Sequence, residues 1–294
     1  MINKRLIVLV GSTAVGKTKK AIELAKHFET EIVSADSRQF YKELKIGVAS
    51  PTMEEQREVR HHFVGNISIY DSYNAATYAT EALQTVEHLF QSHNTVILTG
   101  GSGMYIKALC DGIDLMPDAN PQIREELNQI FAEQGIKPLQ EELMNRDPQY
   151  YDIVDTNNHI RLIRALEVCR STGKPYSSFR RNTKTKHWFE IEKVGILRSR
   201  ESLINRINLR VDDMIAEGLI DEAYRFHNVK HLQAMNTVGY KELFDYFDQK
   251  TTLEKAIENI KTNTRQYAKR QMTWFRKDKA IRWFDLDKED IYVD

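Results

Sequence analysis

The 294-residue sequence is poor in cysteine and proline, with 2 and 6 residues respectively, and its 42 basic and 42 acidic side chains cancel. Two cysteines cannot build a disulfide framework or a cysteine-rich zinc site, so we expect a reducing, cytoplasmic setting. No apolar run approaches the ~18 residues that cross a bilayer, and the N-terminal residues show no signal-peptide pattern, so we expect no membrane association. With no net charge, any nucleic-acid contact must come from local clusters of basic residues.

The strongest signal is the octapeptide from Gly11 to Thr18, which follows an apolar run at 6–10 and opens an amphipathic run at 19–28. It fits G-x-x-x-x-G-K-[ST] at every specified position, in the strand–loop–helix context of a phosphate-binding loop. In such a loop, backbone N–H groups and the helix start surround phosphate oxygens. We therefore expect a phosphate or diphosphate at this loop, with Mg²⁺ on the Thr18 hydroxyl. The expected contacts are Gly11, Ser12, Thr13, Ala14, Val15, Gly16, Lys17 and Thr18.

Two further short runs predict strands that end beside this loop in a parallel sheet. The run 31–35 leads to Asp36, and the run 95–98 leads to the turn Thr99-Gly100-Gly101-Ser102-Gly103. Since ligands of open α/β sheets bind at the carboxyl ends of the strands, we expect Asp36 and Ser102 at the site. The second turn lacks the carboxylate that holds Mg²⁺ in nucleotide-hydrolysing P-loop proteins. A glycine-rich turn alone is equally consistent with chain reversal, but two on one edge favour a diphosphate held from two sides.

Composition divides the chain into an α/β core and a helical insertion. It changes near residues 117–121, and the pattern is then helical until a strand at 189–197. We expect a catalytic core of residues 1–115 plus 189–294, built on a parallel sheet, and a helical insertion domain of residues 116–188. Apolar spacing also predicts helices at 199–218 and 253–275, so the C-terminal part is helical.

Two groups of basic residues lie on these C-terminal helices. Arg206 and Arg210 are four residues apart, and this spacing favours solvated surface charges over a cation pair directed at the phosphate site. Lys261, Arg265 and Lys269 recur every fourth residue, which is usually a solvent-exposed face. The same helix ends in cations mixed with a tryptophan, as single-stranded RNA contacts do, so both interpretations stay open.

A series of segments resembles the bacterial tRNA dimethylallyltransferase (tRNA isopentenyltransferase) family. They run in family order over nearly the whole length: GSTAVGKT (11–18), SADSRQFYKELKIGVASP (34–51), HHFVG (61–65), TGGSGMYIKALCDG (99–112), IRLIRALEV (160–168), TGKPYS (172–177), RINLRVDDMIAEGLIDE (206–222), VGYKEL (238–243) and TRQYAKRQMTWFR (264–276). The phosphate loop alone is unspecific, whereas Asp36-Ser37, the Gly-Gly-Ser-Gly turn and the C-terminal segment are together highly specific.

The resemblance implies a P-loop kinase-like core with a helical insertion that contacts tRNA. It implies transfer of a dimethylallyl group from dimethylallyl diphosphate to N6 of adenine 37 in tRNAs that read codons beginning with U. Asp36 is implied as the base for the adenine amino group, with Thr18, Ser102 and Arg210 acting on the diphosphate. Residues implied to contact the anticodon stem-loop are Asp36, Ser37, Arg38, Gln39, Ser102, Arg124, Arg161, Arg164, Lys241, Arg265, Lys269 and Arg270. We further expect a monomer.

Two other functions fit parts of the sequence. A small-molecule kinase using ATP at the same loop explains residues 1–110, with Asp36 as the base for a hydroxyl group. It explains neither the missing carboxylate after residue 98 nor the cationic, aromatic C-terminus. A tRNA-binding protein without chemistry explains the C-terminus but gives no role to Lys17, Thr18 and Asp36. Asp36 itself could instead cap a helix or bind Mg²⁺.

Overall fold

The computed structural model describes residues 4–118, 120–180, 185–289 and 291. The chain divides into two compact units, one of Met1–Asp111 with Lys186–Asp294 and one of Gly112–Thr185. Composition alone predicts this division a few residues later, with an insertion of residues 116–188. Each unit has its own hydrophobic core, so each is described by itself.

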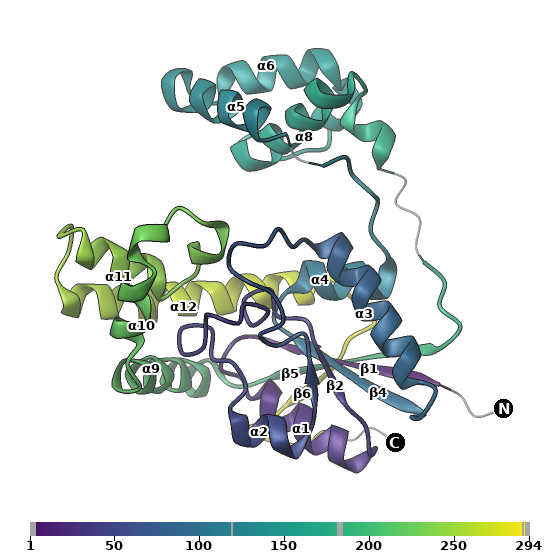
Figure 1. Ribbon diagram of the computed structural model, residues 1–294. Helices are drawn as coiled ribbons and strands as arrows, with labels where there is room; N and C mark the ends of the chain where they lie inside the picture. The colour runs from purple at the N-terminus through teal and green to yellow at the C-terminus, as the bar shows by residue number, and fades with distance from the viewer. Residues whose placement is uncertain (1–3, 119, 181–184, 290, 292–294) are drawn as a thin grey trace. The chain divides into compact units, whose positions relative to one another are not determined.

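The larger unit is built on a six-stranded sheet in which all neighbouring strands are parallel (Figure 1). The strand order is β3-β2-β4-β1-β5-β6. The strands are β1 (Arg5–Gly11), β2 (Ile32–Ser34), β3 (His61–His62), β4 (Thr95–Gly100), β5 (Glu190–Leu197) and β6 (Arg282–Asp285). This sheet confirms the α/β class predicted from the sequence.

Helices cover both faces of the sheet, because successive residues of a strand point to opposite sides. On β1, Leu6 and Val8 pack toward α3 and α4, whereas Ile7 and Leu9 pack toward α1. Burial on both faces explains why this strand is a continuous apolar run. The helices of this unit are α1 (Lys17–His27), α2 (Met53–Glu58), α3 (Ala75–Leu89), α4 (Gly103–Asp111), α9 (Arg200–Ala216), α10 (Leu219–Arg225), α11 (Tyr240–Phe247) and α12 (Leu253–Phe275).

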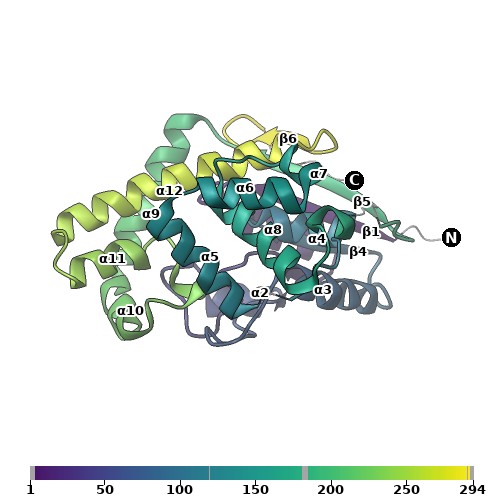
Figure 2. The same cartoon turned by 90° about the horizontal axis from the view of Figure 1, so that it is seen from above.

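Helix α12 runs beside α9 and α11, and it also contacts β1 and α4 (Figure 2). Three buried residues along it pack into different clusters. Ile260 packs with residues of α10 and α11, Ala268 packs with Ala14 of the phosphate loop, and Phe275 packs with residues of the sheet. This helix therefore connects the C-terminal helices with the loop at the edge of the sheet.

Three strands end together at this edge. In the ladder, Val10 lies beside Gly100, and Thr99 lies beside both Leu9 and Ser34. The strands approach so closely that a Cβ atom on Gly100 would lie 2.2 Å from the carbonyl oxygen of Ala35. The phosphate loop, the segment after β2 and the turn after β4 consequently start side by side.

The smaller unit consists of α5 (Pro121–Gln134), α6 (Lys137–Arg146), α7 (Pro148–Tyr151) and α8 (His159–Thr172). Leu127, Leu139, Leu143 and Leu166 form the centre of its core. Across residues 112–118, 120–180 and 185, this unit forms no strand.

Two edge strands were missed by the sequence analysis. β3 has two residues and β6 has four, which is too short to show an alternating pattern. Their pairing partners β2 and β5 supply the hydrogen bonds that define them. Within the described part of the chain, no helix is both long and apolar enough to cross a membrane.

Candidate active site

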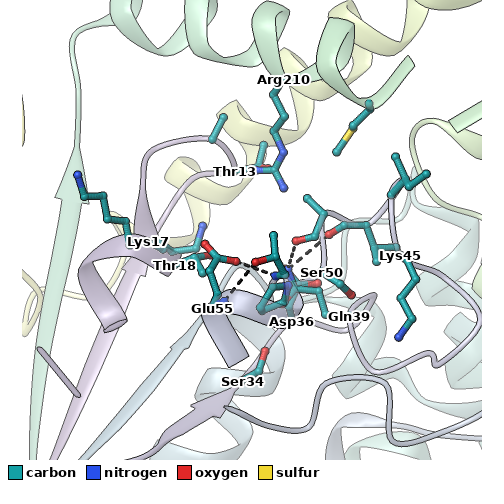
Figure 3. A pocket seen from close by; sticks show the side chains of 18 of the residues that line it. Thr13, Lys17, Thr18, Ser34, Asp36, Gln39, Lys45, Ser50, Glu55 and Arg210 are labelled. Carbon is teal, nitrogen blue, oxygen red and sulfur yellow. Dashed lines mark hydrogen bonds between the residues drawn. The ribbon is translucent and has the colours of Figure 1, made fainter. Parts of the chain in front are cut away.

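A cavity of about 910 Å³ opens at the edge where β1, β2 and β4 end (Figure 3). The phosphate loop, the segment after β2, the segment 45–56, α9 and α12 all contribute to its walls. Thr18 and Asp36, predicted from distant parts of the sequence, both line it. The parallel topology therefore brings these two side chains to one site, as the sequence analysis predicted.

The phosphate loop turns tightly through residues with positive φ. Gly16 has φ 112° and precedes the first residue of α1, while Ala14 has φ 61°. Glycine adopts such an angle without strain, which suits Gly16. Ala14 carries a side chain and is strained there, so its contacts with Arg206 and Ala268 hold it in place. Of the predicted diphosphate contacts, Thr13, Ala14, Gly16, Lys17 and Thr18 line the cavity. Gly11, Ser12 and Val15 are buried behind them.

Lys17 supplies a cation whose charge is sensitive to pH. Its Nζ donates a hydrogen bond to the carbonyl oxygen of Ser12 at 2.8 Å, which leaves two of its three N–H groups for a ligand. Burial lowers the pKa of Lys17 to about 8, with nearby Asp36 opposing this shift and Arg210 adding to it. At neutral pH the ammonium form predominates, as phosphate binding requires.

Arg206 and Arg210 are not simply solvated surface charges, so the interpretation favoured by their spacing is wrong. Both line the cavity, and Arg206 Nε donates to the carbonyl oxygen of Ala14 at 2.7 Å. Figure 3 shows Arg210 pointing from α9 into the cavity, and burial lowers its pKa. The packing of α9 on the phosphate loop, which spacing alone does not reveal, turns this face inward.

Asp36 follows β2 and lies at the start of a turn. Its Oδ1 accepts a hydrogen bond from the backbone N–H of Arg38 at 3.0 Å, which fixes the carboxylate. The residues after it form turns, so Asp36 does not cap a helix. Gly101 faces Asp36 Oδ2, since a Cβ atom added there would lie 3.6 Å from this oxygen. A positioned carboxylate in a cation-rich cavity is suited to accept a proton.

Ser102 occupies a different place from the one predicted. Its Oγ accepts from the backbone N–H of Ser37 and donates to Ser37 Oγ, both at 2.9 Å, and Ser102 is not among the residues that line the cavity. Its hydroxyl proton is thus used on Ser37 and not on a phosphate. Ser102 holds the segment that carries Asp36.

Gln271, a residue that the sequence analysis did not select, connects the two turns at the edge of the sheet. Its Oε1 accepts from the backbone N–H of Thr13 at 2.8 Å, and its Nε2 donates to the carbonyl oxygen of Gly101 at 2.9 Å. The side chain is buried and lines the cavity. Its only signal in the sequence is its position within RQYAKRQMTWFR.

Replacing Gln271 by leucine removes both bonds at nearly constant volume. Since each unpaired buried backbone group costs about 1–3 kcal/mol, we expect a lower free energy of unfolding and weaker binding of the phosphorylated ligand. Thermal unfolding and a titration with inorganic diphosphate measure the two effects. Gln266→Leu, an exposed position on the same helix, is the control. Equal behaviour of the two variants would contradict the bridging role.

Arg38 and Gln39 use their polar groups within the protein. The Arg38 guanidinium donates to the carbonyl oxygens of Gln233 and Asn236, each at 3.2 Å. Gln39 Nε2 donates to the carbonyl oxygen of Ala49 at 2.9 Å. Lys241, on α11, is exposed. The structure therefore gives Arg38 and Gln39 roles in holding loops.

In the smaller unit, the three predicted arginines differ in their surroundings. Arg124 and Arg164 contact Glu167, a fully buried carboxylate, at 2.7 and 2.9 Å. Losing either cation would leave this buried charge poorly compensated, so these two arginines stabilise the unit. Arg161 is exposed.

The regularly spaced cations of α12 also divide into two groups. Lys261 Nζ lies 2.7 Å from Asp212 Oδ1, and Arg265 Nη1 donates to Asn208 Oδ1 at 2.8 Å. Both side chains thus point to α9. Lys269 and Arg270 are exposed, together with Trp274. Of these four cations, Lys269 and Arg270 near the C-terminal end of α12 are therefore the two that a polyanion can reach.

The fold and the site together define a P-loop-type α/β protein with a cation-lined cavity at the edge of its sheet. A family model described as IPP transferase matches residues 39–278. The chain belongs to the IPP transferase family.

Individual relatives agree with this membership. The chain is 50% identical over 283 residues to the tRNA dimethylallyltransferase of Christiangramia forsetii, covering 96% of this chain and 94% of the relative. It is 49% identical over 289 residues to tRNA dimethylallyltransferase 1 of Bacteroides fragilis, covering 98% and 96%.

Solved structures agree as well. The crystal structure of the tRNA isopentenylpyrophosphate transferase from Bacillus halodurans has a TM-score of 0.70 at 36% identity, covering 96% of this chain and 90% of that one. Crystallographic snapshots of a eukaryotic dimethylallyltransferase acting on tRNA give a TM-score of 0.80 at 26% identity, covering 96% and 74%.

Proposed function

We propose that the protein transfers a dimethylallyl group from dimethylallyl diphosphate to N6 of adenine 37 in the anticodon loop of tRNAs that read codons beginning with U. The observation that carries the proposal is one cavity that holds Lys17, Arg206, Arg210 and a fixed carboxylate, in a chain of the IPP transferase family. The cations suit a leaving diphosphate, and Asp36 suits an amino group that must lose a proton. Cytoplasmic action as a monomer completes the proposal.

The chemistry requires help for a weak nucleophile, because the lone pair of the adenine amino group is delocalised into the ring. In the proposed step the N6–C1 bond forms, and the C1–O bond breaks with its electron pair leaving on the diphosphate. The N6 proton passes to Asp36, and such a base contributes about 10²–10⁴-fold. Holding both substrates in one cavity also makes their encounter effectively unimolecular.

The residues that face the diphosphate would stabilise its growing charge. Lys17, Arg206 and Arg210 supply cations, and the N-terminus of α1 adds backbone N–H groups. A Mg²⁺ ion would fit on Thr18 Oγ1, since this ion takes few protein ligands and keeps water and phosphate oxygens. When bound, Mg²⁺ neutralises charge on the diphosphate. Within the described residues, no three His, Cys, Asp or Glu side chains form a metal site.

The tRNA must present adenine 37 outside its stack, at a cost of a few kcal/mol. Contacts with the phosphate backbone would offset this cost. We propose Lys269 and Arg270 for these contacts in the larger unit and Arg161 in the smaller one, because these cations are exposed.

Neutralising the exposed cations Lys269 and Arg270 should change the salt dependence of tRNA affinity. For Lys269→Gln combined with Arg270→Gln, we expect the slope of log affinity against log salt to flatten by about 1.4, since each contact contributes about 0.7 on a single strand. Lys261→Gln is a matched control, because Lys261 is paired with Asp212. A slope unchanged in the double variant would show that both cations are merely solvated.

An ATP-dependent kinase is the alternative that the same loop allows. Mixing the protein with labelled dimethylallyl diphosphate and unmodified tRNA tests the proposal, and mixing it with ATP and small hydroxyl acceptors tests the alternative. We expect label in the tRNA only in the first reaction. Phosphate transfer from ATP without label in tRNA would overturn the proposal.

A further inference from the structure

One wall of the cavity is made by a segment without regular secondary structure. Within the segment 45–51, residues 46–49 form a turn. The segment lines the cavity with the apolar residues Ile46, Val48, Ala49 and Pro51, and also with Lys45 and Ser50. Since no sheet ladder or helix fixes these residues, other contacts must place them.

Glu222 of α10 accepts hydrogen bonds from three successive backbone N–H groups of this segment, whose Ile46 and Val48 also pack in a hydrophobic cluster. Its Oε2 accepts from the backbone N–H groups of Lys45 and Ile46, each at 3.0 Å. Its Oε1 accepts from the N–H of Gly47 at 2.9 Å and from the hydroxyl of Tyr240 at 2.6 Å. The residue is only 8% exposed. A carboxylate offers acceptors alone, so it matches four converging donors in a way that no neutral side chain does.

Further contacts hold the same segment from its other side. Gln39 Nε2 donates to the carbonyl oxygen of Ala49, whose φ of 45° is unusual for a residue with a side chain. A Cβ atom on Gly47 would lie 2.5 Å from the Tyr240 ring, so only glycine fits beneath it. A strained backbone persists where its surroundings determine it from several directions, and here they do.

The position of this wall determines how much room the isoprenoid chain of the donor has. With the diphosphate at Lys17 and Thr18, the isoprenoid chain must lie against apolar side chains, which come from this segment and from Leu209 and Met214 of α9. We propose that Glu222 is a positioning residue that fixes the wall, and that the fixed wall makes the site selective for a five-carbon donor over longer prenyl diphosphates. This inference rests on the proposed function.

Glu222→Gln in the full chain tests the proposal. Whichever way the carboxamide turns, its NH₂ group faces donors that need an acceptor. We expect faster hydrogen exchange in a peptide spanning residues 44–50. We also expect the ratio of kcat/KM for geranyl diphosphate to that for dimethylallyl diphosphate to rise about ten-fold, the effect typical of a loosened apolar pocket. The KM for the five-carbon donor should rise more than kcat falls.

Asp221→Asn makes the matched change at an exposed neighbour on α10 and should alter neither readout. Should Glu222→Gln fail to fold, Tyr240→Phe is the second variant, because it removes the hydrogen bond from the Tyr240 hydroxyl to Glu222. It should change the exchange rate and the ratio of kcat/KM for the two donors in the same direction, by a smaller amount. Unchanged exchange would show that Glu222 does not hold the segment. Faster hydrogen exchange with an unchanged ratio of kcat/KM for the two donors would show that the wall does not select the length of the prenyl chain. A wild-type protein inactive with both donors would overturn the proposed function, while the exchange experiment would still test the contacts of Glu222.

Discussion

Asp36→Asn is expected to lower the single-turnover rate of prenyl transfer by about 10²–10⁴-fold. Asparagine keeps an oxygen for the backbone N–H of Arg38, so the local structure is retained. Its amide cannot accept the N6 proton, so the proton transfer is lost. Rapid-quench kinetics with labelled donor and saturating tRNA measure this rate directly.

Two conditions make the Asp36 result specific. Because the carboxylate helps to keep Lys17 charged, its loss lowers the pKa of Lys17 further, so the comparison belongs at pH 6.5, where the ammonium form predominates. Asp213→Asn removes another carboxylate from the cavity lining and should leave the rate near that of the wild type. A loss of only a few-fold for Asp36→Asn would rule out its assignment as the base.

Lys17→Met is expected to lower kcat/KM for the donor by about 10²–10³-fold, the effect of removing one group that stabilises developing charge. The wild type should also show a pH dependence that this variant lacks. The protonated lysine binds the diphosphate, and its pKa is about 8 in the protein without donor. The contribution of Lys17 to donor affinity should therefore be constant well below pH 8 and fall by up to ten-fold per unit above it.

Lys17→Arg is the informative control for this pH dependence. Its guanidinium stays charged throughout the range, and ionisation of the diphosphate itself affects both proteins alike. The ratio of wild-type to Lys17→Arg affinity should therefore fall as the pH rises from 7 to 9.5. Calorimetric titration with inorganic diphosphate yields these affinities without turnover. A ratio that stays constant over this range would mean that Lys17 does not bind the ligand through its charge.

The parts of the site that the sequence predicted are those with a local signal. The phosphate loop is recognisable from the spacing of its glycines between a strand and a helix. Asp36 follows a short apolar run, and parallel strands must end at one edge. These features can be predicted without knowing how the helices pack against one another.

The remaining parts depend on packing between distant segments. Arg206 and Arg210 looked like surface charges because spacing does not say which way a helix is turned. Lys261 lies in a regular stripe, yet Asp212 of α9 pairs with it. Gln271 and Glu222 act through backbone groups 170 or more residues away along the chain, so no local pattern marks them.

The roles of Lys17 and Asp36 can be seen together in a crystal structure with the non-reacting thiolo analogue of dimethylallyl diphosphate and an anticodon stem-loop. We expect diphosphate oxygens within hydrogen-bonding distance of Lys17 Nζ and the N–H groups at the start of α1. We also expect N6 of an extruded adenine 37 within the same distance of Asp36. A diphosphate bound away from Lys17, or Asp36 turned from the base, would contradict these roles.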